Sequence, residues 1–151
     1  MADIMIQNPN LAIELVDDQF ADLTISIPLN WTDIRAVGTT YRALVKIYGD
    51  DDSFRGGDDY LGLYYTDQFS AGLENFMDVA RVSRDILDED EGHGAIARLR
   101  RKRDEDEIYV VVQLEVFAWG SRWGRFNRRT TRFFQGFQGS RKSNTVTGIR
   151  F

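Results

Sequence analysis

The sequence predicts an α+β or mostly β fold, in which an antiparallel sheet, sandwich or partial barrel carries one main amphipathic helix at about residues 72–87. Residues 108–119 alternate between a wholly aliphatic set and a mixed set, which is typical of a strand with one face in the core. Shorter stretches elsewhere alternate in the same way. There is no regular succession of strand and helix patterns that would favour a parallel, doubly wound sheet.

The other expected strands lie on both sides of this central one. In residues 20–29 one side is apolar, and Pro28 predicts a sheet edge or a strand end because proline donates no ladder hydrogen bond. In residues 39–48 an apolar set alternates with Arg42, Leu44, Lys46 and Tyr48. Further strands are expected at residues 11–16, 60–65, 125–137 and 145–151.

The helix is expected because apolar residues recur at helical spacing between residues 73 and 87. This stripe, interrupted by one arginine, consists of Leu73, Phe76, Met77, Ala80, Arg84 and Leu87. Residues 30–38 predict a short helix or turn. Residues 95–103 fit either a basic helix or the first strand of a hairpin that leads into residues 108–119, and the hairpin is favoured.

The 151 residues are expected to form a single domain, 1–151, with residues 1–10 as a candidate N-terminal arm. The absence of cysteine excludes disulfides and thiolate chemistry. No leader-like segment and no apolar run of about 20 residues is present, so we expect cytoplasmic synthesis without secretion and no membrane partner.

Charge is distributed very unevenly along the chain. Residues 1–94 hold 6 basic and 19 acidic residues, a net of −13, whereas residues 95–151 hold 13 basic and 5 acidic residues, a net of +8. This asymmetry predicts one surface that attracts cations and another that attracts anions. The two parts could equally neutralise each other within one fold or between subunits.

Residues 50–59 form the most acidic loop. Its carboxylates belong to Asp50, Asp51, Asp52, Asp58 and Asp59. The spacing fails the helix-loop-helix calcium template, so contact with a basic partner is favoured over a metal site. The single histidine, His93, lies between two glycines without a recognisable nucleophile or orienting partner. No catalytic residue, metal or cofactor is predicted, and no small-molecule substrate.

Arginine and aromatic residues interleave in the C-terminal third. The candidate binding residues are Arg122, Trp123, Arg125, Arg128, Arg129 and Arg132, with Arg98, Arg100 and Arg101 as a second basic group. Arginine pairs with phosphate or carboxylate, and aromatic rings stack on unpaired bases. The segment therefore suits either nucleic acid or an acidic protein partner.

These patterns together favour a non-enzymatic structural subunit of a homomeric or mixed assembly, held by contacts between the acidic N-terminal part and the basic C-terminal part. A virion or phage tail-type component is the kind of assembly that the composition suggests. The alternative is a nucleic-acid-binding protein that uses residues 122–134. A third hypothesis is a small enzyme or ligand-binding barrel lined by Trp31, Tyr41, Tyr64 and Phe117.

Overall fold

The structure is a computed structural model that describes residues 4–31, 40–50, 58–70, 72–88, 106–123, 128–136 and 139–151. Of the short helix or turn expected at residues 30–38, Asn30 and Trp31 are in a strand instead, and residues 32–38 lie outside the described part. Residues 95–103 also lie outside it.

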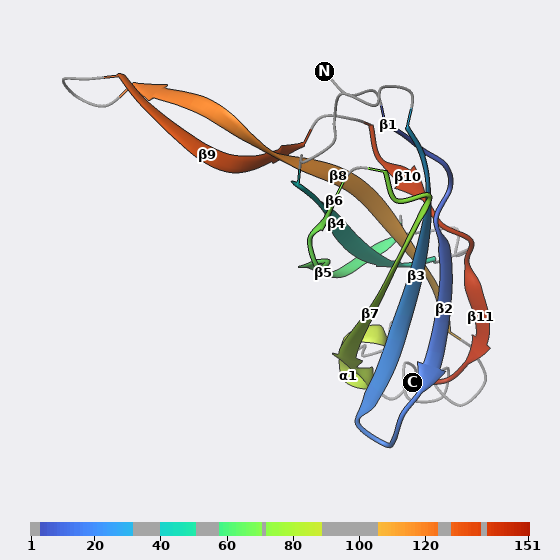
Figure 1. The fold of residues 1–151 in the computed structure, drawn as a ribbon. Coiled ribbons are helices and arrows are strands. Elements are labelled where there is room, and N and C mark those ends of the chain that lie inside the picture. The colour runs from blue at the N-terminus through green and yellow to red at the C-terminus, as the bar shows by residue number, and fades with distance from the viewer. Residues whose placement is uncertain are drawn as a thin grey trace.

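The described strands form two antiparallel sheets (Figure 1). The first sheet contains β1 (Ile4–Ile6), β2 (Asn10–Leu15), β3 (Phe20–Trp31) and β7 (Asn75–Ser83). The second contains β4 (Thr40–Gly49), β5 (Asp59–Tyr65), β6 (Phe69–Ser70), β8 (Asp106–Trp123), β9 (Arg128–Gly136), β10 (Arg141–Lys142) and β11 (Val146–Ile149). The fold is mostly β, with antiparallel sheets, and this part of the prediction is confirmed. Among the predicted alternatives of sheet, sandwich and partial barrel, the structure is sandwich-like and not a closed barrel.

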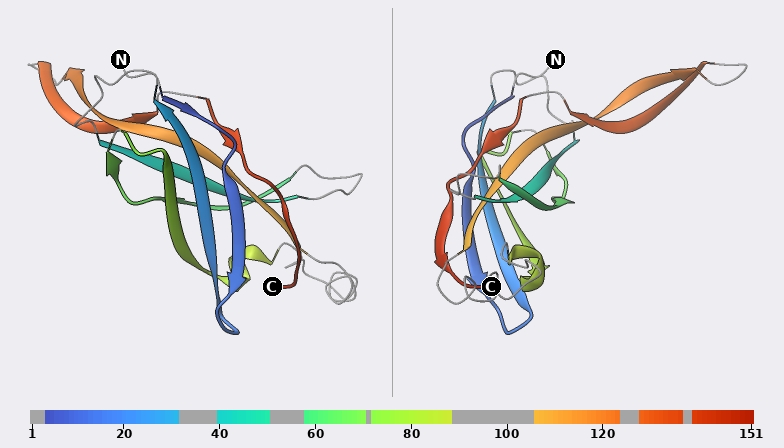
Figure 2. Two further views of the ribbon diagram at one scale, coloured as in Figure 1. Left: turned by 45° about the vertical axis from the view of Figure 1, so that its right-hand side comes forward. Right: turned by 180° about the vertical axis from the view of Figure 1, so that it is seen from behind.

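The core lies between the two sheets, whose strands cross obliquely (Figure 2). Alternate residues of β3, β4 and β8 point inward and are buried, because successive side chains of a strand point to opposite faces. The fully or almost fully buried members include Leu23, Ile25, Ile27, Ala43, Val45, Ile47, Val110, Val112 and Leu114. One continuous cluster therefore joins both sheets.

Pro28 lies inside β3, which is not an edge strand, because β7 pairs on one side and β1 and β2 on the other. The proline is tolerated for a local reason. It is opposite Asn75, the first residue of β7, where the pairing of β3 with β7 ends. It also lies in the gap between the residues of β3 that pair with β1 and those that pair with β2. Its carbonyl still accepts a hydrogen bond of 3.2 Å from the Gln7 amide.

The predicted helix at residues 72–87 is wrong. Residues 75–83 form β7, which pairs with β3 from Phe20 opposite Ser83 to Pro28 opposite Asn75, and only α1 (Arg84–Leu87) is helical. All nine residues of β7 pair with β3, and this pairing overrides the weak local preference for helix. The true period of two was hidden because Asp78 occupies an inward position between Phe76 and Ala80.

A polar staple joins the two sheets at one side of the sandwich. The Asn144 side chain makes the two hydrogen bonds that a neighbouring strand would make with Leu11. Its Oδ1 accepts from the Leu11 amide at 2.7 Å, and its Nδ2 donates to the Leu11 carbonyl at 3.0 Å. The neighbouring Ser143 Oγ accepts from the Val110 amide at 2.9 Å. Backbone groups of β2 and β8 thus obtain partners from one short segment.

Candidate interaction surfaces

The strands β8 and β9 continue far beyond the sandwich (Figures 1 and 2). Residues 108–116 of β8 pair with β4, but residues 117–123 pair, within the described residues, with β9 alone. We call residues 117–123 together with residues 128–134 the projecting hairpin. Seven residues at about 3.3 Å each extend it by roughly 23 Å.

The projecting hairpin brings together four of the eight arginines that the sequence singled out: Arg122, Arg128, Arg129 and Arg132. The strand register places Trp119 opposite Arg132, Arg122 opposite Arg129, and Trp123 opposite Arg128. The hairpin segment, residues 117–134, contains five arginines and no acidic residue, and no acidic residue occurs anywhere after Glu115. Arg98, Arg100, Arg101 and Arg125 lie outside the described residues.

Carboxylates gather at the opposite end of the second sheet. Gly49 is opposite both Ile108 and Asp59, so the end of β4 and the beginning of β5 lie beside the start of β8. We call Asp50, Asp58, Asp59 and Glu107 the acidic rim. The Asp50 amide donates to the Glu107 carbonyl at 2.7 Å. Asp51 and Asp52 lie outside the described residues.

The outward side of the second sheet carries a row of aromatic rings that sequence reasoning missed. The Tyr48 ring stacks on Tyr109 at 5.4 Å between centroids and meets the Tyr60 ring edge-on at 5.7 Å. Lys142 Nζ lies 3.8 Å from the centroid of the Tyr109 ring, and the Tyr109 hydroxyl donates to Asp58 Oδ2 at 2.5 Å. Burial and this bond to a carboxylate both raise the pKa of Tyr109.

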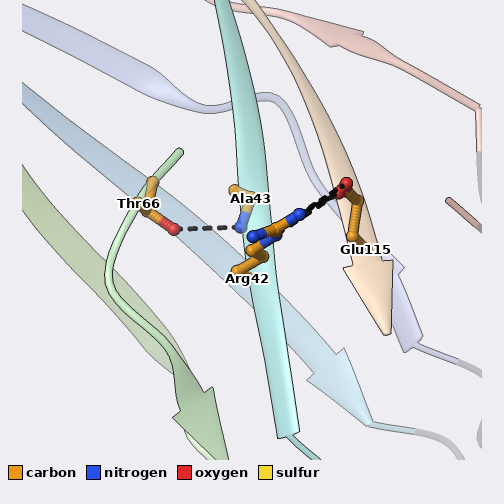
Figure 3. A network of polar contacts seen from close by, with 4 residues as sticks. All are labelled: Arg42, Ala43, Thr66 and Glu115. Carbon is orange, nitrogen blue, oxygen red and sulfur yellow. Dashed lines mark hydrogen bonds and ion pairs between the residues drawn. The ribbon is translucent and has the colours of Figure 1, made fainter. Parts of the chain in front are cut away.

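Another cation, Arg42, lies against an aromatic ring farther along the outward side of the second sheet. The Arg42 guanidinium is 3.9 Å from the centroid of the Tyr65 ring and 3.3 Å from Glu115 Oε2 (Figure 3). The adjacent Ala43 amide donates to Thr66 Oγ1 at 2.9 Å, which fixes β4 against the chain that follows β5. Arg42 is therefore held in place by a carboxylate and an aromatic face together.

We call the outward residues of β4 and β5 the tyrosine face: Leu44, Lys46, Tyr48, Tyr60, Leu63 and Tyr65. The β5 residues are well exposed, at 55% for Tyr60 and 49% for both Leu63 and Tyr65. A signal was present in the sequence, because the outward set of residues 39–48 mixes Leu and Tyr with cations instead of being plainly polar. The rings on β5 and β8 join this set only through strand pairing.

Of the four residues proposed to line a barrel pocket, the structure gives the surroundings of Tyr41 and Tyr64. Tyr41 is buried in the core and stacks on Phe69 at 5.9 Å. Tyr64 lies half-buried beside β7, and its buried hydroxyl has no hydrogen-bond partner in the described part of the chain. Burial raises the pKa of Tyr64, and the nearby charge of Asp78 adds to this effect.

Asp78, inward on β7, is the basis of a pH prediction. Its pKa is raised, chiefly because burial disfavours the charged form, while a 3.4 Å hydrogen bond from the Asp67 amide opposes the shift. A raised pKa means that ionised Asp78 destabilises the fold at neutral pH and that this cost vanishes in acid. Asp78→Asn keeps an acceptor oxygen, so it should raise the melting temperature at pH 7 and leave it nearly unchanged at pH 3.

Circular dichroism melts of both forms at the two pH values check this. Asp18→Asn, in the exposed turn after β2, is the control and should change neither value. A lower melting temperature for Asp78→Asn at pH 7 would contradict the assignment.

The described residues contain neither a metal-binding cluster nor a membrane-spanning helix. No group of three or more His, Cys, Asp or Glu side chains there is arranged to hold a metal ion. No helix in that part of the chain is long and apolar enough to cross a membrane. His93 lies outside it.

Comparisons with known proteins give no family. No protein-family model and no curated protein matches the chain. Among solved structures, a protein from Archaeoglobus fulgidus matches with a TM-score of 0.40 and 10% identity, over 95% of this chain and 98% of that one. Beta-glucosidase 3B from Thermotoga neapolitana, in complex with glycerol, matches with a TM-score of 0.38 and 11% identity. That match includes 93% of this chain but only 16% of the glucosidase chain. Similarity at this level supports no conclusion about function.

Proposed function

We propose that this protein is a non-enzymatic structural subunit of a homomeric or mixed assembly, and that the projecting hairpin makes the contact with a neighbouring subunit. The observation that carries the proposal is the extension of β8 and β9 beyond the sandwich, where residues 117–123 pair with β9 alone within the described residues.

A two-stranded ribbon without neighbouring strands has little stability in water. An isolated hairpin is marginally stable at best, and it has two edges of unpaired backbone groups. A partner that covers the ribbon would supply the missing contacts. This one is also rich in arginine and aromatic residues, which are enriched in protein interfaces.

The charges of the fold favour a head-to-tail arrangement. The described strands of the hairpin carry four arginines at one end of the second sheet, and the acidic rim lies at the other end. Contact between two different patches of identical subunits is heterologous, and it generates rings or filaments. A virion or phage tail particle is one assembly of this kind, and that part of the hypothesis stays a prediction.

Charge reversal on the hairpin tests the proposal. In Arg128→Glu/Arg129→Glu two cations become anions, so the contact with a carboxylate-rich neighbour should become repulsive. We expect the mass in solution at low salt to fall to that of a single chain, measured by light scattering. Arg128→Lys/Arg129→Lys keeps the charge and should keep most of the assembly. An unchanged oligomer in the Glu variant would remove these residues from the interface.

The same hairpin supports a second candidate function, which is nucleic-acid binding. The major groove of DNA admits a two-stranded β ribbon, and arginines paired with phosphates would release counterions. This function predicts binding of a labelled single strand or duplex that falls steeply with salt. Titration at two salt concentrations tests it, and no binding at low salt would end it.

A further inference from the structure

We propose that the tyrosine face of one copy of this protein is the docking site for the projecting hairpin of a second copy. The inference rests on the proposed assembly function and names the surface that receives the hairpin. Four observations lead to it.

The first observation is exposed apolar area beside an open sheet edge. Three large side chains of β5 are about half exposed: Tyr60, Leu63 and Tyr65. Within the described residues β5 pairs with β4 on one side only, so its other edge can accept a further strand. An aromatic and aliphatic group at such an edge is typical of a contact surface, and strand addition supplies backbone hydrogen bonds.

The second observation is that tyrosine rings on this side of the sheet already receive cations. Arg42 lies 3.9 Å from the centroid of the Tyr65 ring, and Lys142 Nζ lies 3.8 Å from that of Tyr109. The segment of residues 117–134 of a neighbour contains five arginines and no carboxylate. Stacking of arginine on tyrosine is therefore a contact that this surface is built to make.

The third observation is the charge around the tyrosine face. Lys46 is a cation within it, and Arg42 and Lys142 lie on rings of the same side. Arg42 is paired with Glu115, and Asp58 and Asp59 are exposed at the margin of the face, next to the half-buried Asp50 of the acidic rim. The balance favours a basic partner over an acidic one. An acidic peptide or a nucleic acid would meet like charge at this margin.

The fourth observation is that the hairpin points away from the face of its own chain. The acidic rim adjoins Ile108, whereas the hairpin leaves the sheet after Val116, roughly 27 Å farther along β8. The strand β8 runs on without interruption to Trp123. The hairpin and the margin of the face thus lie at opposite ends of the second sheet (Figure 2), so the contact joins two copies.

The outward side of the first sheet is a weaker candidate. Met77 and Val79 on β7 are exposed at 60% and 58%, but the neighbouring charge on that strand is Arg81, which is bound to Asp22 at 2.9 Å. The Asp22 carboxylate is already paired with Arg81, and the outward residues of β7 include no tyrosine. A basic hairpin would therefore find fewer favourable contacts here than on the tyrosine face. It serves as the control surface.

Cysteine cross-linking tests the docking site, because the natural chain contains no cysteine. A size-tagged copy carries Ser121→Cys or, at the position opposite in the register, Thr130→Cys on the hairpin. An untagged copy carries Leu63→Cys on the tyrosine face or Val79→Cys on the control surface. The pairs are mixed at low salt, treated with a short bismaleimide, and resolved by denaturing electrophoresis. Light scattering of each mixture gives its mass before cross-linking.

We expect the mixed product with Leu63→Cys to exceed that with Val79→Cys at least tenfold, and to disappear at high salt. Equal products, or a larger one with Val79→Cys, would overturn the docking site. So would an oligomer that gives no product with Leu63→Cys, although the assembly function would stand. A mass of one chain in every mixture at low salt would overturn both proposals.

Discussion

Replacement of residues 118–133 by the dipeptide Asn-Gly is expected to give a folded monomer. Phe117 and Phe134 are directly opposite each other, and Asn-Gly is the preferred two-residue connection between such a pair. Every residue of the described core cluster lies outside the segment removed. The sandwich should therefore keep its β-type circular dichroism and its cooperative unfolding, while the mass in solution falls to that of one chain at any salt concentration.

A second variant, without any truncation, separates the effect of the hairpin from that of the five arginines in residues 117–134. A full-length variant with all five arginines replaced by glutamine keeps the ribbon and loses the charge, so it should assemble more weakly and with less dependence on salt. An oligomer that survives the Asn-Gly replacement would place the interface elsewhere on the sandwich. An unfolded product would show that the hairpin is needed for folding and would contradict its role as an external contact.

Leu114→Ala is expected to destabilise the sandwich by about 2–5 kcal/mol, the range for removal of a buried leucine side chain. Leu114 is fully buried, lies opposite Ala43, and faces the core from the longest strand of the second sheet. Because Ala43 is already small, the neighbouring strand cannot fill the cavity. The loss should appear as a lower urea midpoint with an unchanged slope.

Leu15→Ala removes the same atoms at a position that is 43% exposed, so it should cost less than about 1 kcal/mol. Both substitutions are best measured in the Asn-Gly background, where assembly adds nothing to stability. Equal losses for the two would contradict the assignment of the core.

Strand positions could be predicted well from the sequence wherever one face is buried and the other polar. The alternation in residues 108–116 and 40–49 reflects burial of every second residue, and β3, β4, β5 and β8 lie where the pattern placed them. The pattern failed at β7, since Asp78 is inward and Met77 and Val79 are outward. This inversion of the usual polarity made a helical stripe look better than a strand.

The two surfaces of the candidate contact differ in how far the sequence could reveal them. The arginine-rich segment was visible as composition, but nothing in residues 108–123 indicates where β4 stops pairing and the hairpin begins. That point depends on the length of a different strand. The tyrosine face depends on pairing too, because Tyr48 on β4 meets Tyr60 on β5 only when the two strands pair.

The central claim is that this chain assembles through contacts between its basic hairpin and an acidic, tyrosine-rich surface. Light scattering of the unmodified protein across a salt series, with absorbance at 260 and 280 nm recorded for each peak, tests this claim most directly. We expect a defined oligomer, free of nucleic acid, whose mass falls as salt rises. A monomer with excess absorbance at 260 nm that salt removes would contradict the account and favour nucleic-acid binding.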